Sequence, residues 1–347
     1  MQLLRDAIDS LVHAETIPSA SVSVWVEGAE VFSHAQGAAR LMPYQQATEA
    51  TPYDLASVTK PFAGGAVAAA LVRDGRLDLD AEVRRVLDDV PAGVTARRLL
   101  QHAAGYAAWS ALYERVPRDL WGTPEARASI LRAARTSPLV YTPGAGHTYS
   151  DLGFLTLLSL LEHVGEAPID ELVRAHLTDP AGVALRWGWA GAAATEDCPV
   201  RGEVVQGVVH DLNCFAMGGR STHAGLFGTA AAVGRLTSAL LDQTIGLDRG
   251  LPDLTDFWRA EGPGSHRLGW DGVTLGAYTS TGRCWPADGV GHLGYTGTSV
   301  WVAPRQRVVA VLLTNRVHPR DDKQPIREAR PRFHDALAAC LGWPSRG

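Results

Sequence analysis

The segment "DLASVTKPFAGG", Asp54 to Gly65, is the most informative stretch of the chain, because it places Ser57 three residues before Lys60 at a predicted helix start. Two interpretations of Ser57 fit this pattern. Serine is a favoured helix N-cap, and Pro61 suits a first turn. Alternatively, residues three apart share a helix face, so Lys60 can activate the Ser57 hydroxyl as a nucleophile.

The rarity of lysine in this chain favours the second interpretation. Of its 32 basic residues, only Lys60 and Lys323 are lysines, and the others are arginines. Of these two cations, only the lysine ammonium can give up its proton in a protein, so a lysine beside Ser57 indicates a need for a removable proton. The chain has no clear G-x-S-x-G elbow, which speaks against the α/β-hydrolase route to an active serine.

Strands are predicted near both ends of the chain. In "SASVSVWVEGAEVFSHAQGAA", residues 19–39, valines alternate with other residues and "EGAE" supplies a turn, so a hairpin is expected. A second hairpin is expected in "TSVWVAPRQRVVAVLLTNR", residues 298–316, where two β-branched runs flank "APRQ". Helices are predicted at the N-terminus and over residues 57–73, 229–242 and 326–341.

The middle of the chain has a different character. Between residues 76 and 215, helical patterns such as "TARRLLQHAAG" and "FLTLLSLLEHV" alternate with loops that contain proline and glycine. We therefore predict an α/β (α+β) protein with an antiparallel sheet flanked by helices. Residues 1–75 and 216–347 build this sheet domain, residues 76–215 form an inserted, mostly helical domain, and the active site lies in the cleft between them.

Composition narrows the classes of function. With 347 residues, 46% hydrophobic and 20% charged, the chain can bury a sizeable core. A net charge of −5 without a basic run gives no reason to expect nucleic acid. No apolar run approaches the roughly eighteen residues of a membrane span. Asp6 and Asp9 interrupt the apolar residues of the first predicted helix, so we do not expect this helix to be a signal peptide. A cytoplasmic location is therefore expected. The four cysteines lack metal-ligand spacing and are expected to be free thiols.

A second candidate segment, "TPGAGHTYSDLGF", contains Tyr149 and Asp151. A phenol near an ammonium titrates below its ordinary pKa, so Tyr149 is expected to accept the Ser57 proton and return it to a leaving group. Asp151 is placed to accept a hydrogen bond from Lys60. The alternative is structural, with Asp151 capping a helix and Tyr149 packing as an aromatic.

A third segment, "GVGHLGYTGTSVWV", combines several glycines with the start of a strand. Its glycines indicate that a ligand or another part of the backbone approaches this segment closely. The N–H of Tyr295, next to Gly294, is the predicted second oxyanion donor beside that of Ser57, and His292 is expected to face the cleft. The alternative is a glycine-rich turn with a histidine whose hydrogen bonds are satisfied.

Other side chains are expected to border the same cleft. In "VVHDLNCFAMGG", His210 and Asp211, together with His223, are more consistent with a structural or loop-fixing role than with catalysis. Tyr106 and Trp109 are predicted to form an apolar wall of the pocket.

In this order, the three segments resemble the serine β-lactamase and penicillin-binding superfamily, specifically its class C β-lactamase-like branch. That branch carries Ser-x-x-Lys, Tyr-x-Asn, and Lys-Thr-Gly or His-x-Gly, where this chain has "SVTK", "YSD" and "HLG". The likeness extends over about residues 5–342 and includes "LLQHAAGYAAW" and "VHDLNCFAMGGRSTHAGLFGTA". It implies that Ser57 is acylated, that Lys60 and Tyr149 share the acid–base work, and that the N–H groups of Ser57 and Tyr295 form the oxyanion hole. It implies no metal and no organic cofactor.

Two departures from that pattern bear on the substrate. Asp151 replaces an asparagine, and His292-Leu293 replaces the Lys-Thr pair that helps to hold a substrate carboxylate, so that anchor is expected to be weak. The resemblance therefore favours an esterase-like serine hydrolase that acts on a small ester or amide. A β-lactamase, a D-amino-acid peptidase and an acyltransferase remain alternatives, as does a binding or sensor protein without turnover. The oligomeric state stays open.

Overall fold

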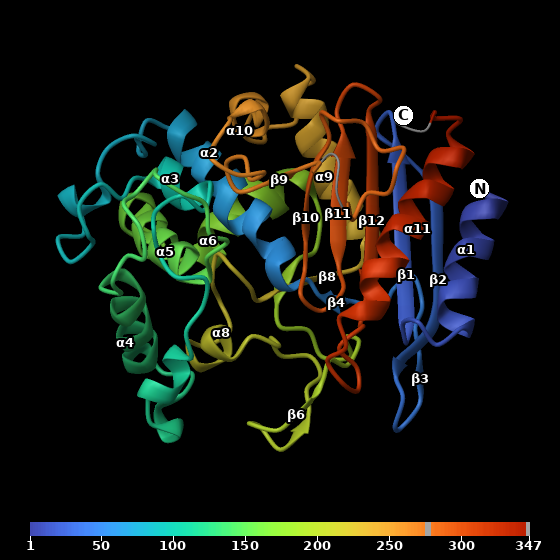
Figure 1. Cartoon of the computed structure of the whole chain (residues 1–347), viewed down its shortest axis with the longest axis horizontal. Coiled ribbons are helices and arrows are strands. Elements are labelled where there is room, and N and C mark those ends of the chain that lie inside the picture. The colour runs from blue at the N-terminus through green and yellow to red at the C-terminus, as the bar shows by residue number, and fades with distance from the viewer. Residues whose placement is uncertain (275–278, 345–347) are drawn as a thin grey trace.

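The computed structural model describes residues 1–274 and 279–344, and its largest element is a seven-stranded antiparallel sheet (Figure 1). The strand order is β3-β2-β1-β12-β11-β10-β9, so the first and last strands of the chain pair in the middle of the sheet. Strands from both ends of the chain with helices around them confirm the predicted fold class. The strands of this sheet are β1 (Ser19–Val26), β2 (Ala29–Arg40), β3 (Gln45–Gln46), β9 (Asp271–Gly272), β10 (Val290–Leu293), β11 (Ser299–Ala303) and β12 (Val308–Thr314).

Both predicted hairpins are present. Val26 pairs with Ala29 across a turn in which Glu27 and Gly28 have positive φ, the conformation that a two-residue hairpin turn requires. Ala303 pairs with Val308 across the second turn.

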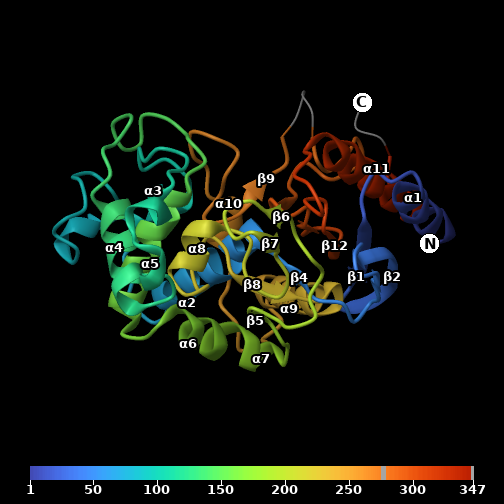
Figure 2. The same cartoon turned by 90° about the horizontal axis from the view of Figure 1, so that it is seen from below.

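Helices cover both faces of the sheet. On one face lie α1 (Gln2–His13) and α11 (Gln324–Cys340), and on the other lies α9 (Ala230–Thr244) (Figure 2). Because both faces are covered, β1 is buried on its serine side as well as on its valine side, which simple alternation does not predict. Gly234 lets α9 approach β1 closely, because a Cβ there would lie 2.3 Å from Trp25 Nε1.

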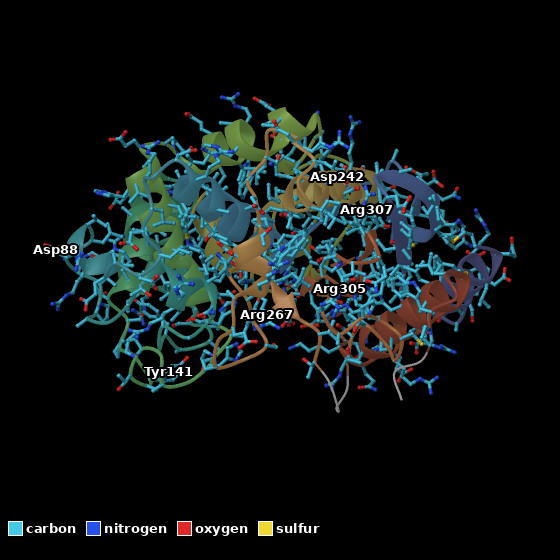
Figure 3. The ribbon with its side chains drawn as sticks, turned by 90° about the horizontal axis from the view of Figure 1, so that it is seen from above. Asp88, Tyr141, Asp242, Arg267, Arg305 and Arg307 are labelled. Atoms are coloured by element: carbon cyan, nitrogen blue, oxygen red, sulfur yellow. The ribbon has the colours of Figure 1, made fainter. Side chains whose placement is uncertain are left out.

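A buried carboxylate ties α9 to the turn between β11 and β12. Asp242 near the end of α9 is 2.7 Å from Arg249 Nη2 and 3.4 Å from Arg307 Nη2, in the turn before β12. Figure 3 shows Asp242 and Arg307 side by side on this face, with Arg305 nearby. The two arginines neutralise a charge that would otherwise be costly to bury.

Helical segments from the middle of the chain and the helix that follows Ser57 pack on the long buried helix α5 (Asp151–Gly165), and the division of the chain into two domains stays a prediction. The short strands form two small sheets, β4 (Tyr53–Asp54), β8 (Leu226–Gly228) and β5 (Arg186–Trp187), and β6 (Asp197–Cys198) with β7 (Glu203–Val204). The other helical segments are η1 (Ala56–Val58), η2 (Lys60–Ala66), α2 (Val67–Arg73), η3 (Val83–Arg85), α3 (Ala96–Leu100), η4 (Leu112–Arg115), η5 (Arg118–Leu120), α4 (Pro124–Arg135), α6 (Ile169–Val173), η6 (Arg174–Thr178), α7 (Asp179–Ala181), α8 (Leu212–Ala216) and α10 (Thr255–Arg259).

Among the described residues, no single helix combines the length and apolarity needed to cross a bilayer. Within the same residues, only α5 and the segment Ile169–Ala181 taken together reach that length and apolarity, and they are bent by 75° relative to each other. The four cysteines are free thiols, as expected.

Candidate active site

The nucleophile segment departs from a regular helix. The predicted single helix over residues 57–73 is a 3₁₀ turn at Ala56–Val58, a π-helical turn at Lys60–Ala66 and only then the α-helix α2. A 3₁₀ turn eclipses side chains three residues apart, and Lys60 Nζ donates a hydrogen bond to Ser57 Oγ at 2.9 Å. The N-cap interpretation of Ser57 is wrong, because Leu55 and Thr59 occupy the cap positions.

Lys60 is fully buried and surrounded by groups that keep it charged. Its Nζ lies 2.6 Å from Asp151 Oδ1, 3.5 Å from the His223 carbonyl oxygen and 4.7 Å from the centroid of the Tyr149 ring. Burial lowers the pKa of Lys60, but the charge of Asp151 and the hydrogen bonds to Asp151 and Tyr149 outweigh it, and the net pKa is raised. Lys60 is therefore an ammonium in the resting protein.

Asp151 is free to pair with Lys60 because its neighbour caps the helix. Ser150 is the N-cap of α5, and its hydroxyl accepts a hydrogen bond from the Gly153 N–H at 3.0 Å. Asp151 is the first helical residue, and its own N–H donates to the Ala108 carbonyl at 2.8 Å. The capping alternative for Asp151 is therefore wrong.

Tyr149 lies beside the nucleophile and the ammonium, but its acidity differs from the expectation. Burial raises the pKa of Tyr149, and the opposing effects of the Lys60 charge and of hydrogen bonds to Lys60 and Ser57 do not compensate. The expected lowering of this pKa is wrong, because removal from water disfavours a phenolate more than one ion-paired ammonium favours it. Tyr149 is a neutral phenol at rest.

A wall of histidines packs against Tyr149. Its ring centroid is 4.4 Å from that of His102, 5.4 Å from that of His266 and 6.0 Å from that of His292. Burial lowers the pKa of His266 to about 4 and that of His102 and His292 well below the ordinary value. His292, on β10, therefore lines the cleft as a neutral group without a lysine's charge.

Ligand atoms of His102, His266 and His292 lie within 4.8 Å of one another, so we tested the cluster as a metal centre. The Ser150 N–H donates to His102 Nδ1 at 2.9 Å. A backbone N–H can only donate, so it occupies the Nδ1 lone pair, and the neutral His102 ring must carry its proton on the buried Nε2. That nitrogen has no lone pair to offer a metal, and we assign none.

The predicted oxyanion segment packs tightly on the nucleophile turn. Thr298 Oγ1 donates to the Leu55 carbonyl at 2.8 Å, and the Gly294 N–H donates to the Thr298 carbonyl at 2.7 Å. A Cβ on Gly294 would lie 2.5 Å from the Leu55 oxygen, so only glycine permits this approach. The turn that follows Gly294 thus brings Tyr295 to the same cavities as Ser57.

Two cavities of about 400 and 420 Å³ flank the nucleophile, and Ser57, Tyr149 and Tyr295 line both of them. We call them the cationic cavity and the acidic cavity after their charged lining. The cationic cavity is also lined by His266, Asp271, His292, Leu293, Gly294, Arg316, Lys323, Ile326, Arg327 and Arg330. The acidic cavity is also lined by Ala56, Ala108, Trp109, Asp151, Glu196, His210, Asp211, Leu212, His223 and Ala224.

One predicted wall residue is not at the site. Tyr106 is 1% exposed in the core, does not line either cavity, and donates its hydroxyl proton to the Arg135 carbonyl at 2.9 Å. Burial raises its pKa to about 12. Trp109 does line the acidic cavity and is half exposed.

The role of Asp54 was not predicted from the sequence, although this residue begins the segment Asp54 to Gly65 that contains Ser57. Asp54 is 2% exposed, and its carboxylate accepts the Ala56 N–H at 2.8 Å and the His210 N–H at 2.6 Å. Its carbonyl oxygen accepts the Thr296 hydroxyl at 2.7 Å. Ala56 has a φ of 47°, a left-handed conformation that is costly for alanine. Asp54 is thus a positioning residue that holds the nucleophile turn to two neighbouring segments.

Asp54→Asn is expected to lower kcat/KM for an ester by roughly tenfold or more. The asparagine NH₂ must face the N–H of Ala56 or His210, which leaves buried donors unpaired at a cost of about 1–3 kcal/mol. Steady-state kinetics and urea unfolding measure the two effects separately. The matched control is Asp248→Asn, in an exposed turn where the carboxylate accepts the Gly250 N–H. Equal kinetics for the two variants would contradict the role of Asp54.

A sequence profile of the β-lactamase family matches residues 4–331 of the chain. The chain therefore belongs to the β-lactamase family, whose fold is that of the serine β-lactamases and penicillin-binding proteins. The family is one of serine hydrolases. A protein of Salmonella agona (strain SL483) named "Putative D-alanyl-D-alanine carboxypeptidase" is 27% identical over 314 residues, which cover 76% of this chain and 69% of that protein.

Solved structures share the fold over the whole chain. EstCE1, described as a hydrolase with promiscuous acyltransferase activity, superposes with a TM-score of 0.74 at 20% identity, covering 97% of this chain and 98% of that one. The D-amino acid amidase from Ochrobactrum anthropi SV3 gives a TM-score of 0.73 at 20% identity, covering 98% and 99%. At this identity the likeness concerns the fold.

Proposed function

We propose that this protein cleaves small esters or amides through an acyl-enzyme on Ser57, with carboxylesterase-type activity. The observation that carries the proposal is the 2.9 Å contact between Lys60 Nζ and Ser57 Oγ beside the buried carboxylate of Asp151. A protein that only binds would not need a nucleophile, an exchangeable ammonium and a phenol at one point. The proposed chemistry uses no metal and no organic cofactor.

The first step removes the Ser57 proton. Because Lys60 rests as an ammonium, the base must be generated within the cluster. Transfer of one Lys60 proton to Asp151 Oδ1, 2.6 Å away, leaves an amine. That amine accepts the Ser57 proton while Oγ bonds to the substrate carbonyl carbon, and the N–H groups of Ser57 and Tyr295 stabilise the resulting oxyanion.

The second step expels the leaving group. Tyr149 donates its phenolic proton to the leaving oxygen or nitrogen as the bond to the acyl carbon breaks, and Lys60 returns a proton to the phenolate. Water then attacks the acyl-enzyme, and the same groups act in reverse to release the acid and restore Ser57. Tyr149 suits the donor role because it is neutral at rest.

Acyl-enzyme formation is tested with p-nitrophenyl butyrate and nitrocefin, following product release and intact mass in parallel. We expect steady turnover of the ester, little turnover of nitrocefin, and a transient mass increase that is absent in Ser57→Ala. Ser129→Ala, at an exposed position of α4, is the control. Fast nitrocefin turnover would favour a β-lactamase instead, and a stable adduct without turnover would favour a sensor. No adduct with any acyl donor would exclude the proposal.

The pH dependence tests the Lys60–Asp151 pair. In the proposed first step the amine forms by proton transfer from Lys60 to Asp151, so the reactive state needs no net loss of a proton. Asp151→Asn removes that acceptor, and the amine then forms only when Lys60, an ammonium at rest, loses its proton to water. The rising limb of kcat/KM against pH should therefore move to higher pH, and kcat/KM near neutral pH should fall. A limb that stays in place would mean that Asp151 is not the proton acceptor.

A further inference from the structure

We propose that the natural substrate is a zwitterion, a short peptide or peptide-like ester with a free ammonium at one end and a free carboxylate at the other. The inference rests on the proposed acyl-enzyme function and adds the substrate class. Its basis is the opposite charge of the two cavities that meet at Ser57. The carboxylate would lie in the cationic cavity and the ammonium in the acidic cavity.

The cationic cavity receives its charge from the segment that leads into α11 and from α11 itself. Its lining includes four basic side chains, while Asp271 is the one acidic side chain among its described lining residues. Arg316 is anchored, because its Nε donates to the Tyr295 carbonyl at 2.8 Å and its Nη1 pairs with Asp321. Lys323 is exposed, and its Nζ lies 5.0 Å from the centroid of the Tyr295 ring. The basic lining residues are Arg316, Lys323, Arg327 and Arg330.

These cations change the expectation drawn from His292 and Leu293. Those two residues supply neither a charge nor a hydroxyl, and burial keeps His292 neutral. The four cations from α11 and the segment before it nevertheless line the same cavity, so a substrate carboxylate has partners there. An arginine or lysine pairs well with a carboxylate in a partly desolvated site.

The acidic cavity carries the opposite charge. Its carboxylates, Asp151, Glu196 and Asp211, are each about one-fifth exposed, so their oxygens reach the cavity. Asp151 is neutralised by Lys60, whereas the ion-pair partners of Glu196 and Asp211 are histidines, at 3.4 and 3.0 Å, and Asp211 also accepts the Cys214 N–H. These carboxylates are not an isolated surface cluster, because they share their cavity with Ser57 and Tyr149, and a substrate must enter it in every turnover.

Both acids are ionised near neutral pH. Burial opposes ionisation of Asp211, but His223 and the Cys214 N–H outweigh burial and lower its pKa to about 2. Hydrogen bonding from His210 lowers the pKa of Glu196. A cleft with fixed positive charge on one side of the nucleophile and negative charge on the other favours a dipolar substrate in one orientation. A singly charged substrate would leave the charges of one cavity without a partner, and a neutral substrate would leave the charges of both cavities without one.

Binding is tested on Ser57→Ala, so that the result does not depend on turnover. Four forms of alanyl-alanine, in D,D and L,L series, are titrated by calorimetry: both ends free, N-acetylated, C-amidated, and blocked at both ends. We expect the free dipeptide of at least one series to bind about tenfold more tightly than either singly blocked form, since one ion pair of this kind is worth about a factor of ten. The doubly blocked form should bind most weakly.

Two substitutions then test which cavity binds the ammonium end of the dipeptide and which binds the carboxylate end. Glu196→Gln should abolish the preference for the free ammonium and keep the preference for the free carboxylate, and Lys323→Gln should do the opposite. Glu203→Gln, on β7 and exposed, is the matched control for the acidic side. Arg84→Gln, 54% exposed in its side chain, is the control for the basic side.

The two proposals fail separately. Equal affinity for free and blocked dipeptides, or no binding of any form at millimolar concentration, would overturn the zwitterion. Ester turnover by the wild-type protein would then still support the Ser57 acyl-enzyme. Conversely, preference for the free dipeptide in Ser57→Ala, without acylation of the wild-type protein by any donor, would support the binding specificity and refute the acyl-enzyme.

Discussion

Lys60→Arg should lower kcat/KM for p-nitrophenyl butyrate by about a thousandfold or more. The arginine keeps the positive charge, but a guanidinium does not release a proton in a protein, so no base can form beside Ser57. Lys60 is also fully buried, with its Nζ 5.4 Å from the centroid of the Phe154 ring, so the larger guanidinium must displace its neighbours. Labelling of Ser57 should be lost together with turnover.

Loss of activity in Lys60→Arg is informative only if the fold survives. Thermal unfolding and far-UV circular dichroism of the variant are compared with those of Arg84→Lys, the converse exchange at an exposed site. Lys60→Met supplies a second check, because it removes both charge and proton without adding bulk. Turnover within tenfold of wild type in either folded Lys60 variant would exclude the proton-transfer role of Lys60.

Tyr149→Phe should lower kcat/KM by about 10² to 10⁴ for substrates with a poor leaving group, the range expected of a general acid. The loss should be smaller for p-nitrophenyl esters, because p-nitrophenolate leaves without being protonated. The comparison is made with alkyl and p-nitrophenyl esters of one acid. The dependence on the leaving group, rather than the loss alone, identifies Tyr149 as the proton donor.

Tyr106→Phe is the matched control for this substitution. Tyr106 is also a buried tyrosine, and its hydroxyl bonds to the Arg135 carbonyl and to Thr156 in the core, away from both cavities. Removing that hydroxyl should cost about 1 kcal/mol of stability and leave both rates within a factor of two. An equal loss for both esters in Tyr149→Phe would indicate that the phenol acts before departure of the leaving group.

Motifs that act over a few residues could be predicted from the sequence. The contact between Ser57 and Lys60 follows from their spacing of three, and both hairpins follow from β-branched runs around short turns. The order of the three motifs indicated the family before any coordinates. Each of these features depends on local geometry, which neighbouring residues largely determine.

Properties that depend on burial could not be predicted in this way. The pKa of Tyr149 was expected to fall because only the nearby ammonium was considered, but burial has the larger effect. Tyr106 is predicted as an apolar wall of the pocket together with Trp109, yet it is buried in the core. The extent to which water is removed from a side chain depends on segments that pack on it from elsewhere in the chain.

The sequence by itself determined the fold class, the spacing that brings Lys60 to Ser57, and the family. Only the tertiary structure decided the charges around the site, because Glu196, Asp211 and Lys323 come from segments far apart in the chain and meet only after folding. Likewise, Asp54 can hold the turn that contains Ser57 only because the segments of His210 and Thr296 pack against Asp54 and donate hydrogen bonds to it. Coulombic interactions and hydrogen bonds act over a few ångströms in space, whatever the separation along the chain.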